Sequence, residues 1–144
     1  TDSAFLVADD LELLDQVMAD GVEIDWNHDS YDNARERLGA GRSIGCRVGL
    51  SRHSAMEAAE AGADYVCFCA SPPAQGSSTA MVEMLQWWMP IFEVPCMALA
   101  NDDAEAVAML SATNADFIAL DAESAIKELH ALTGAQCDGQ DLVQ

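Results

Sequence analysis

Basic residues are scarce in this sequence of 144 residues. Lys127 is its one lysine, and together with five arginines it faces 25 aspartates and glutamates, for a formal net charge of −19. Binding to a nucleic-acid backbone or to an anionic membrane surface requires a basic face. The charge therefore argues against nucleic acid and membrane as partners. A phosphorylated substrate would need a metal ion or local arginines to offset the acidic field.

Long apolar runs and several familiar motifs are also missing. No run approaches the roughly 18 residues of a membrane-spanning helix, although 51% of the residues are hydrophobic, which indicates a globular domain. There is no G-x-G-x-x-G or Walker loop, which disfavours dinucleotides and nucleoside triphosphates. The five cysteines contain no C-x-x-C pair, so we expect buried thiols in a reducing cytoplasm. A soft-metal site at Cys67 and Cys69, with Cys46 or Cys96, is the weaker alternative.

Six short apolar runs alternate with six helical segments. Strands are expected at residues 4–8, 21–25, 43–48, 64–69, 95–100 and 116–120, and helices at residues 10–19, 31–38, 55–61, 80–92, 101–112 and 122–132. Ser30 and Thr79 are the expected caps of the second and fourth helices, and residues 49–54 are expected in a loop. We expect one domain over residues 1–134 and a polar tail at 135–144.

This alternation predicts an α/β fold with a parallel sheet, because a strand–helix–strand unit fits a parallel crossover. An open doubly wound sheet and part of an eight-stranded barrel both satisfy the pattern. A receiver-like open sheet, suggested by Asp9-Asp10 after the first strand, is a weaker third option. Similar short segments precede strands at 19–22, 61–66 and 114–118, and such repetition favours a barrel of βα units.

Several segments occur in an order and spacing that resemble a known family. They are AFLVAD at 4–9, ADGV at 19–22, ARERLG at 34–39, IG at 44–45, SRHS at 51–54 and AEAGADYV at 59–66, with a weaker continuation of VP at 94–95 and ADFIA at 115–119. Over about residues 4–125 the chain resembles the thiamine-phosphate synthase family, whose relatives include thiazole tautomerases. Those proteins are (β/α)8 TIM barrels, so the resemblance implies about six βα units, corresponding to the family's strands 3 to 8.

The resemblance also implies an incomplete barrel. The family's first two units have no counterpart here, and the first residue is Thr1 rather than methionine. A barrel without two strands exposes unpaired edges. We therefore expect a fragment of a longer protein, or a chain completed by association, which leaves a homo-oligomer open.

The family's reaction couples a pyrimidine diphosphate to a thiazole phosphate and releases pyrophosphate, a step of thiamine biosynthesis. Mg²⁺ holds the leaving group in that reaction. By resemblance, the metal ligands are Asp9 and Asp29, with His28 and Asp25 as alternatives to Asp29. Asp9 and Asp10 would equally serve as a helix cap.

The same resemblance suggests the remaining site residues. Ser51 and His53 match a family segment that touches substrate and are the implied catalytic residues. Arginines can contact phosphate in a bidentate way, or simply balance an acidic surface. The candidate substrate-binding residues are Arg47, Arg52, Ser71 and Asn101.

Three of the family's phosphate-binding features are missing. The loop at 70–78 contains no lysine and no tautomerase histidine, and Ala100-Asn101 stands where the family has Gly-Gly. Ala122 replaces a serine and is flanked by two acids, which disfavour a nearby phosphate. Two hypotheses remain: a divergent thiamine-phosphate synthase, or a repurposed barrel that has lost its phosphate sites.

Overall fold

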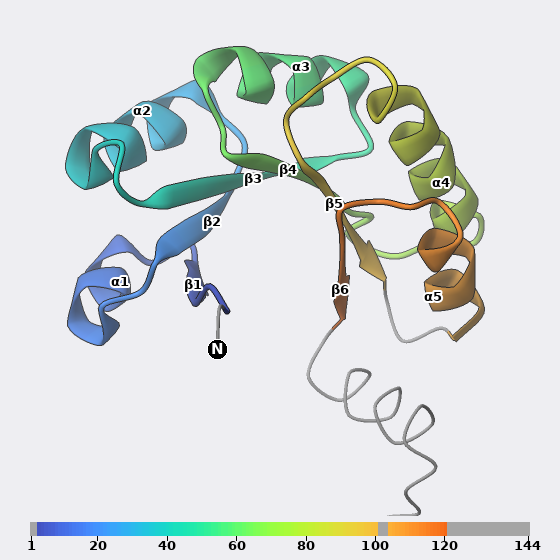
Figure 1. Ribbon diagram of the computed structural model, residues 1–144, viewed down its shortest axis with the longest axis horizontal. Coiled ribbons are helices and arrows are strands. Elements are labelled where there is room, and N and C mark those ends of the chain that lie inside the picture. The colour runs from blue at the N-terminus through green and yellow to red at the C-terminus, as the bar shows by residue number, and fades with distance from the viewer. Residues whose placement is uncertain (1–2, 101–103, 121–144) are drawn as a thin grey trace, which may run out of the picture.

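The computed structural model describes residues 3–100 and 104–120, which form one curved parallel sheet flanked by helices (Figure 1). The strands are β1 (Leu6–Ala8), β2 (Gly21–Asp25), β3 (Ser43–Gly49), β4 (Tyr65–Phe68), β5 (Cys96–Ala100) and β6 (Phe117–Leu120). The helices are α1 (Leu11–Val17), α2 (His28–Leu38), α3 (Arg52–Ala61), α4 (Ser77–Trp88) and α5 (Ala104–Ser111). The helix expected at 122–132 and the tail expected at 135–144 lie outside the described residues.

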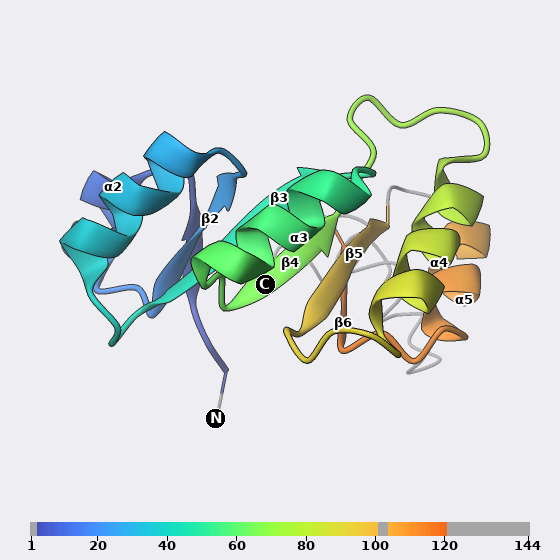
Figure 2. The same cartoon turned by 90° about the horizontal axis from the view of Figure 1, so that it is seen from above.

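The strand order distinguishes a barrel from a doubly wound sheet. Neighbouring strands follow the chain order from β1 to β6, and every pair is parallel. Right-handed crossovers that always advance in one direction put every helix on the same face. Figure 1 shows α1 to α5 along the convex side of the sheet, and Figure 2 looks onto that side, where α3 lies over β3 and β4. The fold is therefore an α/β half-barrel of the TIM-barrel type, which confirms the barrel prediction.

Strand alternation separates an apolar face from a polar one. Ile24 of β2 and Cys46 of β3 belong to the hydrophobic core between the sheet and the helices. Successive side chains of a strand point to opposite faces. Glu23, Asp25 and Arg47 therefore project from the concave face, where charged groups meet.

The repeated A-D segments seen in the sequence share one structural role. An aspartate just before β2, β4 and β6 accepts a hydrogen bond from a backbone N–H within one residue of the start of the preceding strand. The acceptors are Asp20, Asp64 and Asp116, and their donors are Phe5, Ile44 and Cys96, at 2.7, 2.7 and 3.0 Å. Each aspartate thus ties the beginnings of two neighbouring strands together, which explains why the segment recurs.

Gly45 allows a tyrosine to cross the concave face. Gly45 of β3 pairs in register with Tyr65 of β4, and a Cβ at Gly45 would lie 2.0 Å from the tyrosine ring. The ring therefore occupies the space that any larger residue at Gly45 would need. Tyr65 reaches over β3 in this way and donates a hydrogen bond to Glu23 of β2.

The second and fourth helices begin earlier than the sequence predicted. The cap of α2 is Asn27, whose side chain accepts a hydrogen bond from the Ser30 N–H at 2.8 Å, so Ser30 is the donor and not the cap. Asparagine caps helices as well as serine does, and its signal lies three residues upstream. Gly76 precedes α4 without any side-chain cap, and Thr79 lies inside that helix.

The third helix also begins early. Ser51 is its cap, and the hydroxyl accepts a hydrogen bond from the Ser54 N–H at 3.1 Å. Arg52 and His53 are therefore helical rather than in a loop. Across the described residues, every helix is too short or too polar to cross a membrane.

The strand-tying aspartates yield a stability prediction. Asp64→Ala removes the acceptor for the Ile44 N–H and the partner of Arg35 at 2.8 Å, leaving a partly buried donor unpaired. We expect a loss of about 1–3 kcal/mol in the free energy of unfolding, measured in urea. Asp32→Ala, at an exposed position of α2, is the control and should change it by less than about 0.5 kcal/mol. Equal effects of the two variants would contradict the role given to Asp64.

Candidate functional site

Polar residues from four strands meet at the carboxyl edge of the sheet. Asp9 follows β1, Asp25 ends β2, Arg47 lies near the end of β3, and Cys69 follows β4. Parallel strands all end at the same edge, and barrels of this type bind their substrates there. This edge is therefore the candidate site.

The two aspartates after β1 have separate roles. Asp10 caps α1, since its carboxylate accepts hydrogen bonds from the N–H groups of Glu12 and Leu13 at 3.0 and 2.8 Å. Asp9 has a φ of 58°, in the left-handed region that aspartate tolerates, and its N–H donates to the Glu23 carbonyl at 2.9 Å. The helix cap is therefore Asp10, whereas Asp9 is turned toward the end of β2.

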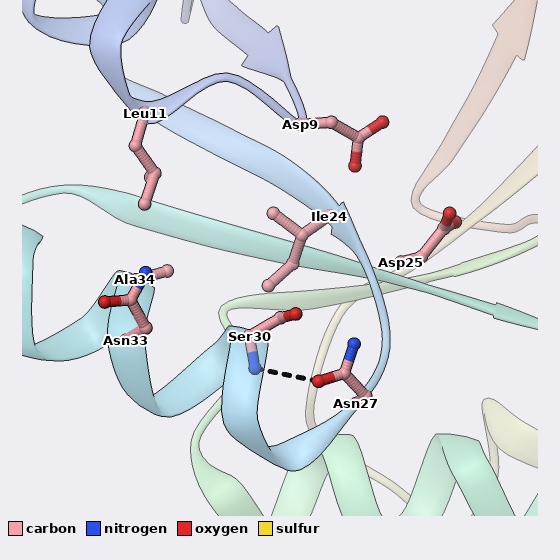
Figure 3. A pocket seen from close by; sticks show the side chains of 8 residues that line it. All are labelled: Asp9, Leu11, Ile24, Asp25, Asn27, Ser30, Asn33 and Ala34. Atoms are coloured by element: carbon pink, nitrogen blue, oxygen red, sulfur yellow. Dashed lines mark hydrogen bonds between the residues drawn. The ribbon is translucent and has the colours of Figure 1, made fainter.

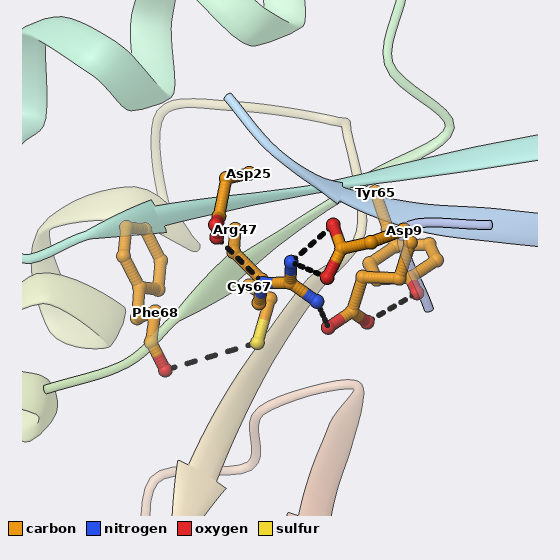
Figure 4. Close-up of polar contacts among 7 residues, drawn as sticks. Asp9, Asp25, Arg47, Tyr65, Cys67 and Phe68 are labelled. Atoms are coloured by element: carbon orange, nitrogen blue, oxygen red, sulfur yellow. Dashed lines mark hydrogen bonds and ion pairs between the residues drawn. The ribbon is translucent and has the colours of Figure 1, made fainter. Parts of the chain in front are cut away.

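Arg47 binds carboxylates on both sides of it (Figure 4). Its Nη2 lies 2.6 Å from each carboxylate oxygen of Asp9, and its Nε donates to Asp25 at 2.7 Å. A third carboxylate, that of Glu23, lies 3.7 Å from Nη1. We call Arg47, Asp9, Asp25 and Glu23 the arginine cluster.

The cluster is ionic, and its arginine is covered while the side chains of Asp9 and Asp25 are 57% and 81% exposed. Only 17% of the Arg47 side chain is exposed. Burial alone would lower the pKa of Arg47, but the hydrogen bonds to Asp25 and Asp9 together outweigh it and raise that pKa. Burial, followed by the hydrogen bond to Glu23, raises the pKa of Tyr65, so this phenol stays protonated as a donor. Charge-assisted hydrogen bonds of this kind hold the guanidinium in one orientation.

Sequence reasoning missed Glu23 and Tyr65 as members of this network. Glu23 is a charged residue between the apolar Val22 and Ile24 in the strand GVEID, and a charge at such a position is the signal that could have identified it. Tyr65 carried no such signal, because an aromatic residue in a strand is ordinary. Only the register of β4 against Gly45 places its hydroxyl over β2.

Two cavities flank the cluster and share Asp25. The first, of about 380 Å³, lies between the ends of β1 and β2 and the helix α2 (Figure 3). Its polar lining includes Asp9, Asn27 and Asn33. The second, of about 450 Å³, is lined by Arg47 and by the loop after β4, including Ser71. Both volumes suit small molecules.

A pair of thiols, one on β4 and one just after it, adjoins the second cavity. Cys67 is buried and Cys69, which lines the cavity, is partly exposed. The neighbouring Cys67 side chain lowers the pKa of Cys69, with help from the Gly49 backbone and Arg47 and against the cost of burial, while the Cys67 thiol itself donates to the Phe68 carbonyl at 3.9 Å. Burial raises the pKa of Cys46 to about 12. Cys69 is therefore the most easily ionised of these thiols.

The two histidines that the sequence suggested as site residues lie outside the arginine cluster, beside one shared carboxylate. His28 and His53 lie 3.5 and 3.3 Å from the same carboxylate, Glu57 of α3. The indole N–H of Trp26 donates to that carboxylate at 3.4 Å, and Trp26 also packs edge-on against His28. The hydrogen bond from Trp26, then that from His28, lowers the pKa of Glu57 against the effect of burial.

Other predicted residues are dispersed. Ser51 caps α3, and Arg52 lies over the ring of Trp87, 4.8 Å from its centroid. Asp29 is exposed in the first turn of α2. The structure thus brings together Asp9, Asp25 and Arg47, with Ser71 across the second cavity. Asn101 lies outside the described residues.

The expected Mg²⁺ ligands do not form a metal site. Mg²⁺ requires several oxygens at about 2.0–2.1 Å in octahedral geometry. Both oxygens of Asp9 are engaged by Arg47, and Asp29 is exposed on another element. Among residues 3–100 and 104–120, no group of three His, Cys, Asp or Glu side chains could hold a metal ion. Asp9 and Asp29 therefore do not fit the ion.

Comparison with known proteins identifies the family. The family model described as thiamine monophosphate synthase matches residues 1–123, and the chain belongs to that family. The resemblance noted in the sequence is confirmed. The family is generally Mg²⁺-dependent.

Similar curated proteins are thiamine-phosphate synthases. That of Erythrobacter litoralis is 39% identical over 124 residues, covering 83% of this chain and 58% of its own length. Those of Rhodospirillum centenum and Hyphomonas neptunium are each 38% identical, over 122 and 120 residues, covering 83% and 81% of this chain and 59% and 54% of their own lengths. The chain thus spans between 54% and 59% of these relatives.

A solved structure supports the fold. A chain in the crystal structure of the Amycolatopsis orientalis BexX/CysO complex superposes with a TM-score of 0.50, over 88% of this chain and 62% of that chain. Its sequence identity is 15%, so it bears on architecture alone.

The thiol pair gives a pH prediction. Only the thiolate is alkylated, so a lowered pKa makes Cys69 react with iodoacetamide at pH values below its ordinary pKa of 9.0. We expect the rate–pH profile of Cys69 to have its midpoint below 9.0, measured by peptide mapping, which separates it from the other cysteines.

The donor thiol supplies the control. Cys67→Ala removes the neighbouring thiol and should move the midpoint of Cys69 upward, whereas Cys67→Ser keeps a polar donor at that position and should move it less. A wild-type midpoint at or above 9.0 would show that Cys69 is not activated.

Proposed function

We propose that this chain acts in thiamine biosynthesis as a thiamine-phosphate synthase, coupling a pyrimidine diphosphate to a thiazole phosphate with release of pyrophosphate. The observation that carries the proposal is the 38–39% identity to thiamine-phosphate synthases across more than 80% of this chain. These relatives favour the synthase over the alternative of a repurposed barrel.

The geometry of the site supports a reaction of two small molecules. Two cavities adjoin each other at the carboxyl edge of the sheet, and both are bordered by Asp25. Arg47, Ser71 and Ser77 border the second cavity and offer a guanidinium and hydroxyl donors to phosphate oxygens. Because the chain is acidic overall, a local arginine is needed to hold an anionic leaving group.

The remaining assignments rest on the resemblance. Ser51 and His53 are proposed catalytic residues, and Arg52 and Asn101 are proposed substrate contacts alongside Arg47 and Ser71. Mg²⁺ is the cofactor that the family implies. We further propose small phosphorylated substrates, a cytoplasmic location, and association with further copies of the chain as an option.

The test is turnover with both substrates. The chain, supplied with a pyrimidine diphosphate, a thiazole phosphate and MgCl₂, should produce thiamine phosphate and pyrophosphate in equal amounts, measured by chromatography and a coupled phosphate assay. Absence of product would contradict the synthase, and if neither phosphorylated substrate binds, the result would favour the repurposed barrel that has lost its phosphate sites.

Arg47→Lys tests the role of the guanidinium. Lysine keeps the charge but loses the planar fork that grips Asp9 and Asp25. We expect kcat/KM to fall by about 100-fold, the usual effect of removing one preorganised stabilising group. Arg37→Lys is the matched control, because Arg37 pairs with Asp15 away from the site, and it should retain full activity. Equal activity of the two variants would show that the Arg47 guanidinium has no role in the reaction.

A further inference from the structure

The positive charge between the carboxylates at the strand ends is supplied by a side chain. Arg47 lies on β3, which is next to β2 and two strands away from β1, and it is in register with Asp25 of β2. Its guanidinium contacts Asp25 through Nε and Asp9 through Nη2, at 2.7 and 2.6 Å. Asp9 and Asp25 therefore have the same cationic partner.

The charges of the cluster explain why a cation is needed there. Three carboxylates, those of Asp9, Asp25 and Glu23, lie within 4 Å of the guanidinium and would repel one another without it. A divalent ion and a guanidinium both relieve that repulsion, but they cannot occupy the same space. Since 83% of the Arg47 side chain is covered and its contacts are charge-assisted, the arginine is held in place.

We infer that the Arg47 guanidinium is the resident cation of this site and replaces a divalent metal ion between Asp9 and Asp25. This inference concerns the protein without substrate and does not rest on the proposed function. The inference does not apply to a metal ion that enters the site already bound to a diphosphate. The site is thus neutralised in part by the protein itself before any ligand enters.

The first test uses the wild-type chain and Mn²⁺ as the probe. Electron paramagnetic resonance reports free Mn²⁺ in a titration of the full chain, with Asp9→Asn as the comparison. We expect the wild-type chain and Asp9→Asn to bind the same small amount of Mn²⁺. Binding by the wild-type chain that is lost in Asp9→Asn would overturn the inference, because Asp9 would then be a metal ligand.

The second test removes the arginine. Arg47→Met deletes the charge and leaves the three carboxylates facing one another, so a divalent ion should now stabilise the fold. In thermal melts we expect MgCl₂ to raise the Tm of Arg47→Met by about 3 °C or more relative to NaCl of equal ionic strength. The wild-type chain and the control Arg37→Met should show no such difference.

The two tests are independent of each other. If Arg47→Met does not fold in NaCl, recovery of a cooperative transition in MgCl₂ supports the inference, and failure to recover it contradicts the idea that one cation replaces the other. The Mn²⁺ titration of the wild-type chain needs no variant of Arg47. Neither test uses thiamine precursors, so a negative turnover assay leaves this inference unaffected.

Discussion

The contact of the Arg47 guanidinium with Asp9 and Asp25 organises the carboxyl edge of the sheet. It joins the ends of β1, β2 and β3 on the concave face, where Glu23 and Tyr65 extend the network to β4. Asp25 also forms a wall shared by both cavities. The shape of each cavity therefore depends on the ion pair between Arg47 and Asp25, and a substitution of Arg47 is expected to alter both cavities.

In this acidic chain, each arginine contacts a carboxylate or an aromatic ring of the protein itself. Arg35 of α2 binds Asp64 and the Gly62 carbonyl, and so connects this helix to the loop before β4. Two further arginines, Arg37 and Arg42, share Asp15, whose pKa is lowered first by Arg42 and then by Arg37. With Arg52 over Trp87 and Arg47 in the cluster, all five arginines bind groups of the chain itself. A phosphate that enters the site has to share arginines already in use.

The sequence predicted the architecture better than the site. Alternating apolar runs and the repeated A-D segments indicated a barrel, because strand burial and strand-tying aspartates are local features. Helix starts were less predictable, since Asn27 and Ser30 are both good caps and only geometry distinguishes them. Asp9 and Arg47 were each identified, but not their pairing, which joins residues 38 positions apart. Tyr65 could not be identified at all, because its role depends on Gly45 across the strand.

The central claim is that Arg47 and Asp9 act as one unit. A double-mutant cycle measures this most directly, with Arg47→Met, Asp9→Asn and the double variant compared by urea unfolding in the absence of metal. The account predicts that the double variant loses less than the sum of the single losses, with a coupling energy of at least about 1 kcal/mol. Additive losses, equal within about 0.5 kcal/mol, would contradict it.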